Sequence, residues 1–236
     1  MSDQRRDTIA ANLVAVRARV EAAAASSDGR PGSGVTLVVV TKTWPASDLR
    51  ILSDLGVRDF GENRHQEAAE KAANLADLDV RWHFIGQVQS NKASRIAGYA
   101  AAVHSVDSVR VARRLDAGAQ QGSRMVDCFI QVSLDPAGAS SGRGGAAVET
   151  VPEIADVIAG CRLLRLAGVM GVAPLGEEAS AAYDRLVAVS RQLELEHPLA
   201  RGISAGMSGD FEAAVRAGAT HVRVGSAVLG RRPSLG

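Results

Sequence analysis

The chain alternates between short apolar runs and longer amphipathic segments along most of its length. There are eight such runs, most of them apolar and several rich in β-branched residues, as is typical of strands that are buried on both faces. Between these runs, apolar residues recur at the three- and four-residue spacing of a helix that packs on one face. The expected strands are 35–40, 57–60, 80–85, 101–105, 127–132, 164–171, 202–206 and 221–225.

The segments between the runs predict helices, and one more helix precedes the first run. In that first helix, apolar residues stand at positions 9, 13, 16 and 20, which predicts an amphipathic helix packed on the outside of the fold. A Gly, Ser and Pro-rich linker, 26–34, follows it. The expected helices are 7–25, 46–55, 64–75, 92–97, 108–120, 152–159, 179–196 and 210–217.

Strands that alternate with helices favour parallel βαβ units. The competing architecture, an open doubly wound sheet, usually carries a G-x-G-x-x-G turn after its first strand. Here the first strand is followed by Thr41, Lys42, Thr43 and Trp44, with no glycine. We therefore predict an α/β fold, a single (β/α)8 TIM-type barrel with an extra N-terminal helix. Residues 1–236 are expected to form one domain, with 1–34 as a helix and linker packed on the barrel.

Composition and charge exclude some classes of partner. A net charge of +1 gives no global electrostatic reason to bind nucleic acid or an anionic membrane. No stretch approaches the roughly 20 apolar residues of a membrane span, and the N-terminus has no apolar signal core. Cys128 and Cys161 lie at no metal-ligand spacing, and two buried thiols in a reducing compartment are favoured over one disulfide. We expect a cytoplasmic protein without a metal site, nucleic acid or membrane partner.

Polar and small residues come directly after most of the apolar runs. In a barrel, the carboxyl ends of all strands meet at one rim, and that rim carries the chemistry. Residues placed there from several different strands should therefore converge on one site. They include Lys42, Asn63, Gln87, His104, Gln131, Ser204 and Arg223, with His83 just before the third of these strand ends.

Lys42 is the most informative of these residues. It follows a wholly apolar strand, so its side chain should point into the mouth of the barrel. A lysine amine that is shielded from water is a good nucleophile toward carbonyl groups. The alternative is a lysine that extends to solvent or pairs with Glu62 or Asp107, and the pattern alone leaves both open.

Two small-residue turns end the last two strands, at 204–210 and 223–226. Barrels often bind phosphate there, with backbone N–H groups at a helix start, and the hydroxyls of Ser208 and Ser226 could add donors. The alternatives are an ordinary helix cap at Ser208 and a tight turn at Gly225. Arg223 could donate to a ring nitrogen or an anion, or form a surface ion pair. His83 and His104 could equally be core histidines.

Seven short motifs carry a resemblance that covers residues 35–230. Their joint order is similar to that of the YggS/PROSC family of pyridoxal 5′-phosphate (PLP) homeostasis proteins, which share a barrel with the N-terminal domain of alanine racemase. The motifs are VTKT at 40–43, FGEN at 60–63, WHFIG at 82–86, QSNK at 89–92, HSVD at 104–107, GMS at 206–208 and VRVG at 222–225.

The resemblance implies PLP as the cofactor of a PLP-binding barrel, attached to Lys42 as a Schiff base. It places the phosphate on the two late turns and Arg223 beside the pyridine nitrogen. Because arginine stays protonated, it cannot hand a proton to that nitrogen, and the cofactor is a poor electron sink. The other contacts that it implies are Asn63, His83, Ser204, Met207, Ser208, Gly225 and Ser226.

The sequence departs from the family pattern in two places. The loop after the fifth strand, at 139–143, has no lysine, and neither does the tail at 230–236. A second covalent attachment point for PLP is therefore not expected there. Arg143, Arg231 and Arg232 could attract phosphate without forming a covalent link.

The resemblance implies a PLP carrier that takes part in PLP homeostasis and delivers the cofactor to apo PLP-dependent enzymes. We assign no catalytic residue, because the tyrosines, Tyr99 and Tyr183, are expected on outer helices away from the rim. The alternatives are a one-domain PLP-dependent amino-acid racemase and a PLP-independent Schiff-base aldolase. We expect a monomer, with a dimer through the 7–25 helix left open, and Lys71 and Lys92 at the surface.

Overall fold

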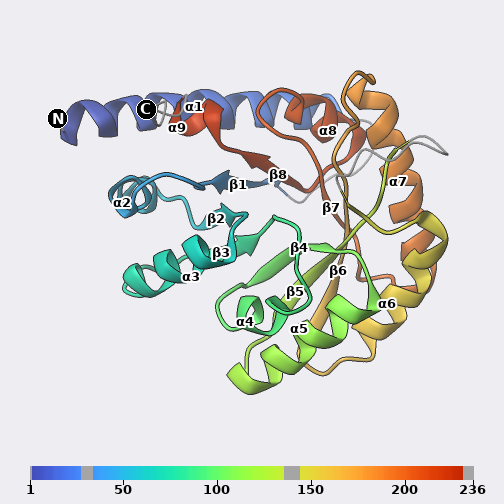
Figure 1. The fold of residues 1–236 in the computed structure, drawn as a ribbon. Helices are drawn as coiled ribbons and strands as arrows, with labels where there is room; N and C mark the ends of the chain where they lie inside the picture. Colours follow the sequence, from blue (N-terminus) through green and yellow to red (C-terminus); the bar gives the residue numbers. More distant parts are fainter. Residues whose placement is uncertain (1, 28–33, 136–143, 231–236) are drawn as a thin grey trace.

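Eight parallel strands close into a barrel in the order in which they occur in the chain, with β1 paired to both β2 and β8 (Figure 1). This computed structural model describes residues 2–27, 34–135 and 144–230. The predicted α/β fold, a (β/α)8 barrel preceded by a helix, is confirmed. The strands are β1 Thr36–Val40, β2 Asp59–Glu62, β3 Arg81–Phe84, β4 Ala102–Val106, β5 Val126–Gln131, β6 Leu164–Met170, β7 Gly202–Ser204 and β8 His221–Val224.

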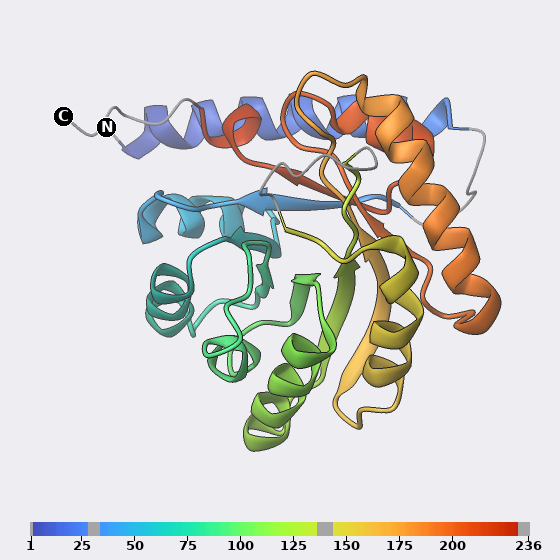
Figure 2. The ribbon, with the colours of Figure 1, turned by 45° about the vertical axis from the view of Figure 1, so that its right-hand side comes forward.

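Helices surround the barrel on the outside (Figures 1 and 2). The sequence pattern missed two short ones, the 3₁₀ helix η1 (Val148–Thr150) and α9, which begins directly after β8. Within the described ranges, no helix has both the length and the apolar character that a membrane span needs. The α-helices are α1 Ser2–Ala25, α2 Ala46–Asp54, α3 His65–Asn74, α4 Ala93–Ala97, α5 Val109–Gly122, α6 Val151–Ala159, α7 Ala179–Glu196, α8 Phe211–Ala217 and α9 Ser226–Leu229.

The second strand begins two residues later than its apolar pattern predicts. The predicted strand 57–60 has apolar residues only at its two ends, Val57 and Phe60, and pairing with β3 extends from Asp59 to Glu62. Two acidic residues therefore lie in a strand whose four residues are all buried. A buried carboxylate needs partners in the protein, and both have them, as described below. Glu62 lies beyond the last apolar residue of the run, Phe60, so the pattern ends the strand too early.

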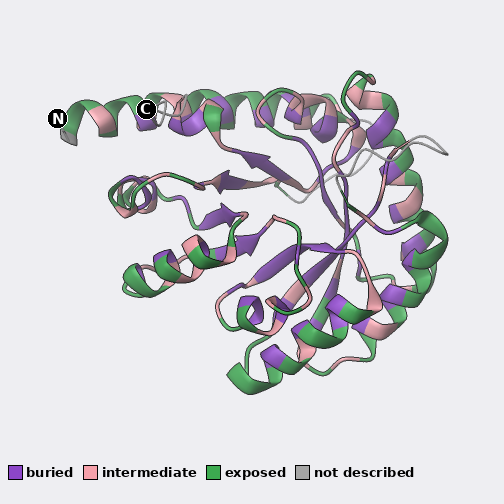
Figure 3. Ribbon diagram, viewed as in Figure 1, coloured by how far each residue is buried: buried purple, intermediate pink, exposed green. Residues whose placement is uncertain are grey.

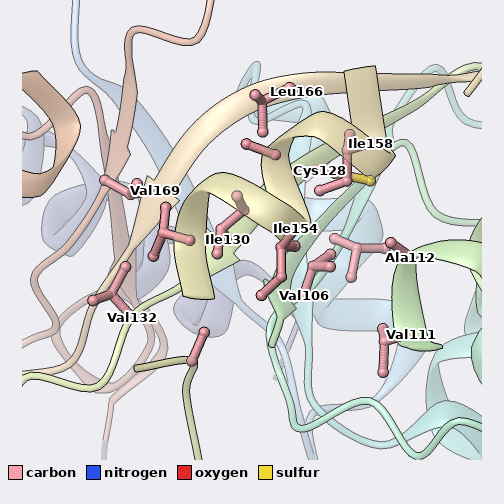
Figure 4. Close-up of a cluster of buried hydrophobic side chains, with 14 of the residues drawn as sticks. Val106, Val111, Ala112, Cys128, Ile130, Val132, Ile154, Ile158, Leu166 and Val169 are labelled. Carbon is pink, nitrogen blue, oxygen red and sulfur yellow. The ribbon is translucent and has the colours of Figure 1, made fainter. Parts of the chain in front are cut away.

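Most of the apolar core lies between the barrel and its helices (Figure 3). On one side, Ile154 and Ile158 of α6 pack toward Ile130 of β5 and Val169 of β6 (Figure 4). These side chains belong to one cluster of buried residues that extends over α4 to α7. A second cluster joins α1, α2, α8 and α9 to strands β1, β2 and β8.

The inside of the barrel, by contrast, holds aromatic and polar side chains. Phe129 stacks on the imidazole of His104 with ring centroids 4.5 Å apart, and His221 meets Phe129 edge-on at 5.0 Å. Ser204 and Arg223 are buried beside them. Branched aliphatic residues usually fill such barrels, so this interior is unusually rich in hydrogen-bonding groups.

Helix α1 packs its predicted apolar stripe against the outside of the barrel. Ile9, Leu13, Val16 and Val20 are buried in the cluster that includes α8 and α9. Polar contacts fix the helix at both ends and in the middle. They are the ion pairs Arg5–Asp48 and Arg19–Glu212 and a hydrogen bond from the Asn12 amide to the Val228 carbonyl.

Both cysteines are free thiols, as the sequence indicates. Cys128 is buried, and burial raises the pKa of its thiol above the ordinary range. Cys161 is only partly buried, so the expectation of two buried thiols holds for Cys128 alone.

We predict that Leu13→Ala lowers the free energy of unfolding by about 2–4 kcal/mol, because it leaves a cavity between α1 and the barrel. Leu13 is 2% exposed, whereas its neighbour Val14 is 68% exposed. Val14→Ala on the same helix should therefore change the free energy by less than about 0.5 kcal/mol. Urea unfolding followed by circular dichroism measures both. Equal losses in the two variants would show that α1 does not pack on the barrel through this stripe.

Candidate functional site

A cavity of about 430 Å³ opens at the carboxyl rim of the barrel. This volume lies within the range of small-molecule sites, and the rim is where barrel enzymes and carriers place their chemistry. Seven of the residues that the sequence singles out line it. They are Lys42, Asn63, Met207, Ser208, Arg223, Gly225 and Ser226, together with Val40, Trp44, Ile85, Gly86, Met170, Val172, Gly209 and Gly230.

Two of the expected cofactor contacts, His83 and Ser204, do not line this cavity. Both side chains are buried inside the barrel. The Ser204 hydroxyl accepts a hydrogen bond from the guanidinium of Arg223 at 2.6 Å. These two residues therefore lie beneath the site. Arg143, Arg231 and Arg232 fall outside the described residues.

Lys42 sits on a tight turn that directly follows β1. The Trp44 amide donates to the Thr41 carbonyl at 3.1 Å, which closes the turn. Thr43 has a φ of 69°, a conformation that is costly for a β-branched residue. Its amide donates to the Glu67 carboxylate, which holds the backbone in this conformation. The geometry fixes the point from which the Lys42 side chain enters the cavity.

Lys71 anchors this turn from below. Its ammonium group donates to the Thr41 carbonyl, to Glu62 Oε1 and to Glu67 Oε1, each at 2.7 Å. The expectation that Lys71 is a surface residue is wrong, since it is only 8% exposed. The three bonds use all three donors of the ammonium group, which is what makes its burial tolerable.

The same contacts show which groups Glu62 bonds to. The sequence left open an ion pair between Lys42 and Glu62, but Glu62 Oε1 instead accepts from Lys71 and from the Thr41 hydroxyl at 2.6 Å. Burial raises the pKa of Glu62, and the bonds from Lys71 and Thr41 oppose that shift without cancelling it. For Glu67, burial is outweighed by its bonds to Lys71 and to the Thr43 amide, so its pKa is lowered.

The two late turns lie side by side at the rim. The Ala227 amide, at the start of α9, donates to the Ser208 hydroxyl at 3.4 Å, which links one turn to the other. Gly225 packs so closely on the end of β1 that an added Cβ would lie 3.2 Å from the Val40 carbonyl oxygen. The turn thus lies against the strand that leads to Lys42, and only glycine allows this approach without displacement.

Tyr183 supports the first of these turns. Its hydroxyl donates to Asp210 Oδ2 at 2.7 Å, and Asp210 Oδ1 accepts from the Met207 amide at 2.6 Å. The expectation that Tyr183 lies away from the rim is therefore wrong for its hydroxyl group, although Tyr183 does not line the cavity. Burial, followed by Asp210, raises the pKa of Tyr183, which keeps the phenol protonated as a donor.

Arg223 brings a buried positive charge to the floor of the cavity. It is 4% exposed, and two of its donors bond Ser204 Oγ at 2.6 Å and the Gly171 carbonyl at 3.0 Å. Burial lowers the pKa of Arg223 to about 10. The guanidinium therefore stays charged at neutral pH, and it can donate to a ligand but cannot give up a proton to it.

Asn63, directly after β2, offers an acceptor to the cavity. Its Oδ1 atom is buried and accepts no hydrogen bond from any described residue. A ligand that carries a donor would satisfy this atom. Its position is fixed, because Gly86 packs so tightly that an added Cβ would overlap the Asn63 carbonyl.

Three residues that support the site from behind do not stand out in the sequence pattern: Glu67, Lys71 and Asp210. One signal was present: Glu67 and Lys71 stand four residues apart on a helix, where oppositely charged side chains meet. Their contact is confirmed. The link to Thr41 and Thr43 depends on the approach of α3 to the end of β1, which no local pattern reveals.

Comparison with known proteins finds relatives along nearly the whole chain. The family model described as the N-terminal domain of alanine racemase matches residues 7–233. A relative from Corynebacterium glutamicum named pyridoxal phosphate homeostasis protein is 44% identical over 225 residues, which cover 92% of this chain and 99% of the relative.

Solved structures show similar relationships. PipY of Synechococcus elongatus PCC7942, solved with PLP bound, is 34% identical, with a TM-score of 0.78, and the match covers 94% of this chain and 100% of PipY. Alanine racemase from Corynebacterium glutamicum is 15% identical with a TM-score of 0.67, and the match covers 62% of that enzyme. The second likeness shows a shared fold alone.

We predict that Lys71→Met lowers the free energy of unfolding by about 3–5 kcal/mol at pH 8, because Glu62 is left buried and unpaired. The pKa of Glu62 is already raised by burial, and the loss of Lys71 should raise it further. A group whose folded-state pKa is raised binds its proton more tightly in the folded state. Part of the loss should therefore disappear as the pH falls from 8 toward 5.

Urea unfolding at several pH values measures this effect. Lys92→Met, which removes a partly exposed lysine, serves as the control and should cost less than about 0.5 kcal/mol. The double variant Lys71→Met/Glu62→Gln should be more stable than Lys71→Met at pH 8. A loss that is the same at every pH would mean that Lys71 does not compensate a buried charge.

Proposed function

The chain belongs to the family of pyridoxal phosphate homeostasis proteins, and we propose that it holds PLP reversibly at the mouth of its barrel, attached to Lys42. In this role it keeps PLP bound and delivers it within the cell. One observation carries the proposal: Lys42, the buried Arg223 and the two Gly/Ser turns line a single cavity.

The residues of the cavity fit the three parts of the cofactor. The turns at Ser208–Gly209 and Gly225–Ser226 offer hydroxyls and backbone amides, and their glycines leave the backbone open to a phosphate group. Arg223 is placed to donate to the pyridine nitrogen, and Asn63 Oδ1 to accept from a donor on the ligand. Lys42 enters from the end of β1, beside Gly225.

When bound, PLP supplies an aldehyde carbon with which a primary amine condenses reversibly, releasing one water molecule. Lys42 provides that amine. The turn closed by Thr41 and Trp44 and anchored by Lys71 restricts where the amine can reach. Arg223 remains a donor and leaves the ring nitrogen unprotonated, which disfavours carbanion chemistry on the cofactor.

Holding rather than turnover is supported by the ionisable groups of the cavity. Among the described residues that line it, only Lys42 and Arg223 are charged, and neither a tyrosine nor a carboxylate reaches it. A racemase needs a second acid–base group on the other face of the cofactor. Delivery to apo PLP-dependent enzymes is the use that a reversible link serves. His83 and Ser204 then act beneath the site, through Arg223.

The packing of α1 bears on the state of assembly. The apolar stripe that could meet a second copy is already covered by α2, α8 and α9 of the same chain. We infer a monomer in which residues 1–236 act as one PLP-binding unit, with the N-terminal helix as part of the barrel.

We predict that the purified protein, given PLP and then reduced with borohydride, carries a pyridoxyl group on Lys42 and shows a visible absorbance band before reduction. The chain has three lysines, Lys42, Lys71 and Lys92, so peptide mass mapping separates them. Lys42→Ala should remove the band and stay folded, whereas Lys92→Ala should keep both band and adduct.

Two results would contradict this proposal. An adduct on Lys92, or none at all, would remove PLP as the ligand of this cavity and favour a PLP-independent aldolase. Racemisation of an amino acid by the PLP-loaded protein, measured by chiral chromatography above the rate of a Lys42→Ala control, would favour an enzyme over a carrier.

A further inference from the structure

An unbroken chain of hydrogen bonds crosses the inside of the barrel and ends at Arg223. It begins at Asp59 at the start of β2, passes through one histidine on β3 and one on β4, and reaches β8 through a serine on β7. The bonds are Asp59 Oδ1 to His83 Nε2 at 2.8 Å, His83 Nδ1 to His104 Nε2 at 2.9 Å, His104 Nδ1 to Ser204 Oγ at 2.7 Å and Ser204 Oγ to Arg223 Nη1 at 2.6 Å.

When both histidines are neutral, the two ends of the chain fix the direction of every bond in it. A guanidinium can only donate, so Ser204 Oγ accepts from Arg223 and its single hydrogen goes to His104 Nδ1. His104 then carries its own hydrogen on Nε2 and donates it to His83 Nδ1. His83 in turn carries its hydrogen on Nε2 and donates it to Asp59, a carboxylate that can only accept.

One more proton would reverse half of this order. If His83 were charged, it would donate to His104 Nε2, and His104 would then donate from Nδ1 to Ser204. Ser204 Oγ would then accept from two donors, His104 and Arg223. The hydrogen bonds of the described residues give its own hydrogen no acceptor. An unsatisfied buried donor is costly, so the arrangement with two neutral imidazoles satisfies more groups.

The surroundings favour the same arrangement. Burial lowers the pKa of His104 well below its ordinary value, and His83, His221 and Arg223 add to the effect. At the far end, burial alone would raise the pKa of Asp59, but hydrogen bonds from His83 and Arg81 outweigh it and leave the pKa lowered. Asp59 is thus held as a carboxylate and His104 as a neutral imidazole.

We propose that Asp59, His83, His104 and Ser204 are positioning residues for Arg223: a one-directional relay, with both histidines in the neutral Nε2–H form, that locks the guanidinium beneath the PLP pocket. The functional part of this inference rests on the proposed PLP site, whereas the proton arrangement does not. The relay also joins the two mouths of the barrel, since Asp59 and Arg81 line a second cavity of about 520 Å³ at the opposite end.

The lock matters because arginine is otherwise a flexible side chain. With Nη1 tied to Ser204 and Nη2 to the Gly171 carbonyl, the plane of the guanidinium is fixed on two sides. A donor held in place loses little entropy when a ligand arrives, so the ligand is retained longer. Loss of the relay should therefore act on PLP release through Arg223, without any direct contact between the histidines and PLP.

The first test is made on the unaltered protein without PLP. Long-range ¹H–¹⁵N spectra of histidine side chains, recorded at pH 7.5, distinguish the two neutral tautomers from the charged ring. The signals of the other three histidines are identified by their loss in the single variants His65→Gln, His197→Gln and His221→Gln. The rings of His83 and His104 should both carry hydrogen on Nε2 alone. A charged His83, or hydrogen on His104 Nδ1, would overturn the relay.

The second test compares two substitutions inside the barrel. His104→Phe breaks the relay and keeps a ring against Phe129, whereas His221→Phe removes a neighbouring imidazole that makes no bond in the relay. In His104→Phe, the guanidinium signals of Arg223 should broaden without PLP. PLP should dissociate about tenfold faster, the effect expected if the loosened guanidinium loses one hydrogen bond to PLP. In His221→Phe, the Arg223 signals and the rate of PLP dissociation should both stay close to those of the unaltered protein.

A third variant guards against a merely structural effect. In His104→Gln the side-chain amide can both accept and donate, so it should restore part of the retention of PLP. Unchanged Arg223 signals in His104→Phe, or loosened signals with unchanged PLP release, would overturn the positioning role. If the unaltered protein itself fails to bind PLP, the proposed function fails, and the tautomer spectra still decide whether the relay exists.

Discussion

The burial of Arg223 governs much of this structure. A guanidinium inside a barrel loses its hydration, which lowers its pKa and would be prohibitive without partners. Ser204 and the Gly171 carbonyl supply two of those partners, and the need to satisfy Ser204 in turn places a histidine beside it. The polar interior of this barrel can thus be understood as the consequence of holding one cation beneath the cavity.

Lys71 shows the same constraint at the other side of the site. Its charge can be buried because three oxygen atoms accept hydrogen bonds from it. One is the Thr41 carbonyl, just before Lys42, and another belongs to Glu67, which also accepts from the Thr43 amide just after Lys42. The two lysines near the cavity therefore have opposite roles. Lys71 is fully engaged with the protein and fixes the backbone, while Lys42 lines the cavity and can meet a ligand.

Much of the fold could be predicted from the sequence, because its signals are local. The apolar runs gave all eight strands, and the helical spacing of Ile9, Leu13, Val16 and Val20 gave the buried face of α1. At β2 the pattern gave the strand but not its bounds, because the buried Glu62 follows the last apolar residue of the run. Asp59 bonds to His83 of β3, and Glu62 bonds to Lys71 of α3. These elements follow β2 in the chain, but the contacts form only in the folded barrel.

The site was predictable as far as it follows from strand ends. Lys42, Arg223, Ser208 and Ser226 all line one cavity because parallel strands end at one rim. The supporting contacts were not predictable, since they join residues that are far apart in the chain, such as Tyr183 to Asp210 and His104 to Ser204. The sequence shows which residues reach the rim, whereas the closed barrel decides which of them face the cavity and which lie beneath it.

The most direct measurement is a crystal structure of the protein with PLP at neutral pH. The account predicts electron density that is continuous from Lys42 Nζ to the cofactor, with the phosphate between the turns at Ser208 and Ser226 and the ring nitrogen within hydrogen-bond distance of Arg223. Density for PLP that is not joined to Lys42, or a phosphate bound away from these two turns, would contradict it.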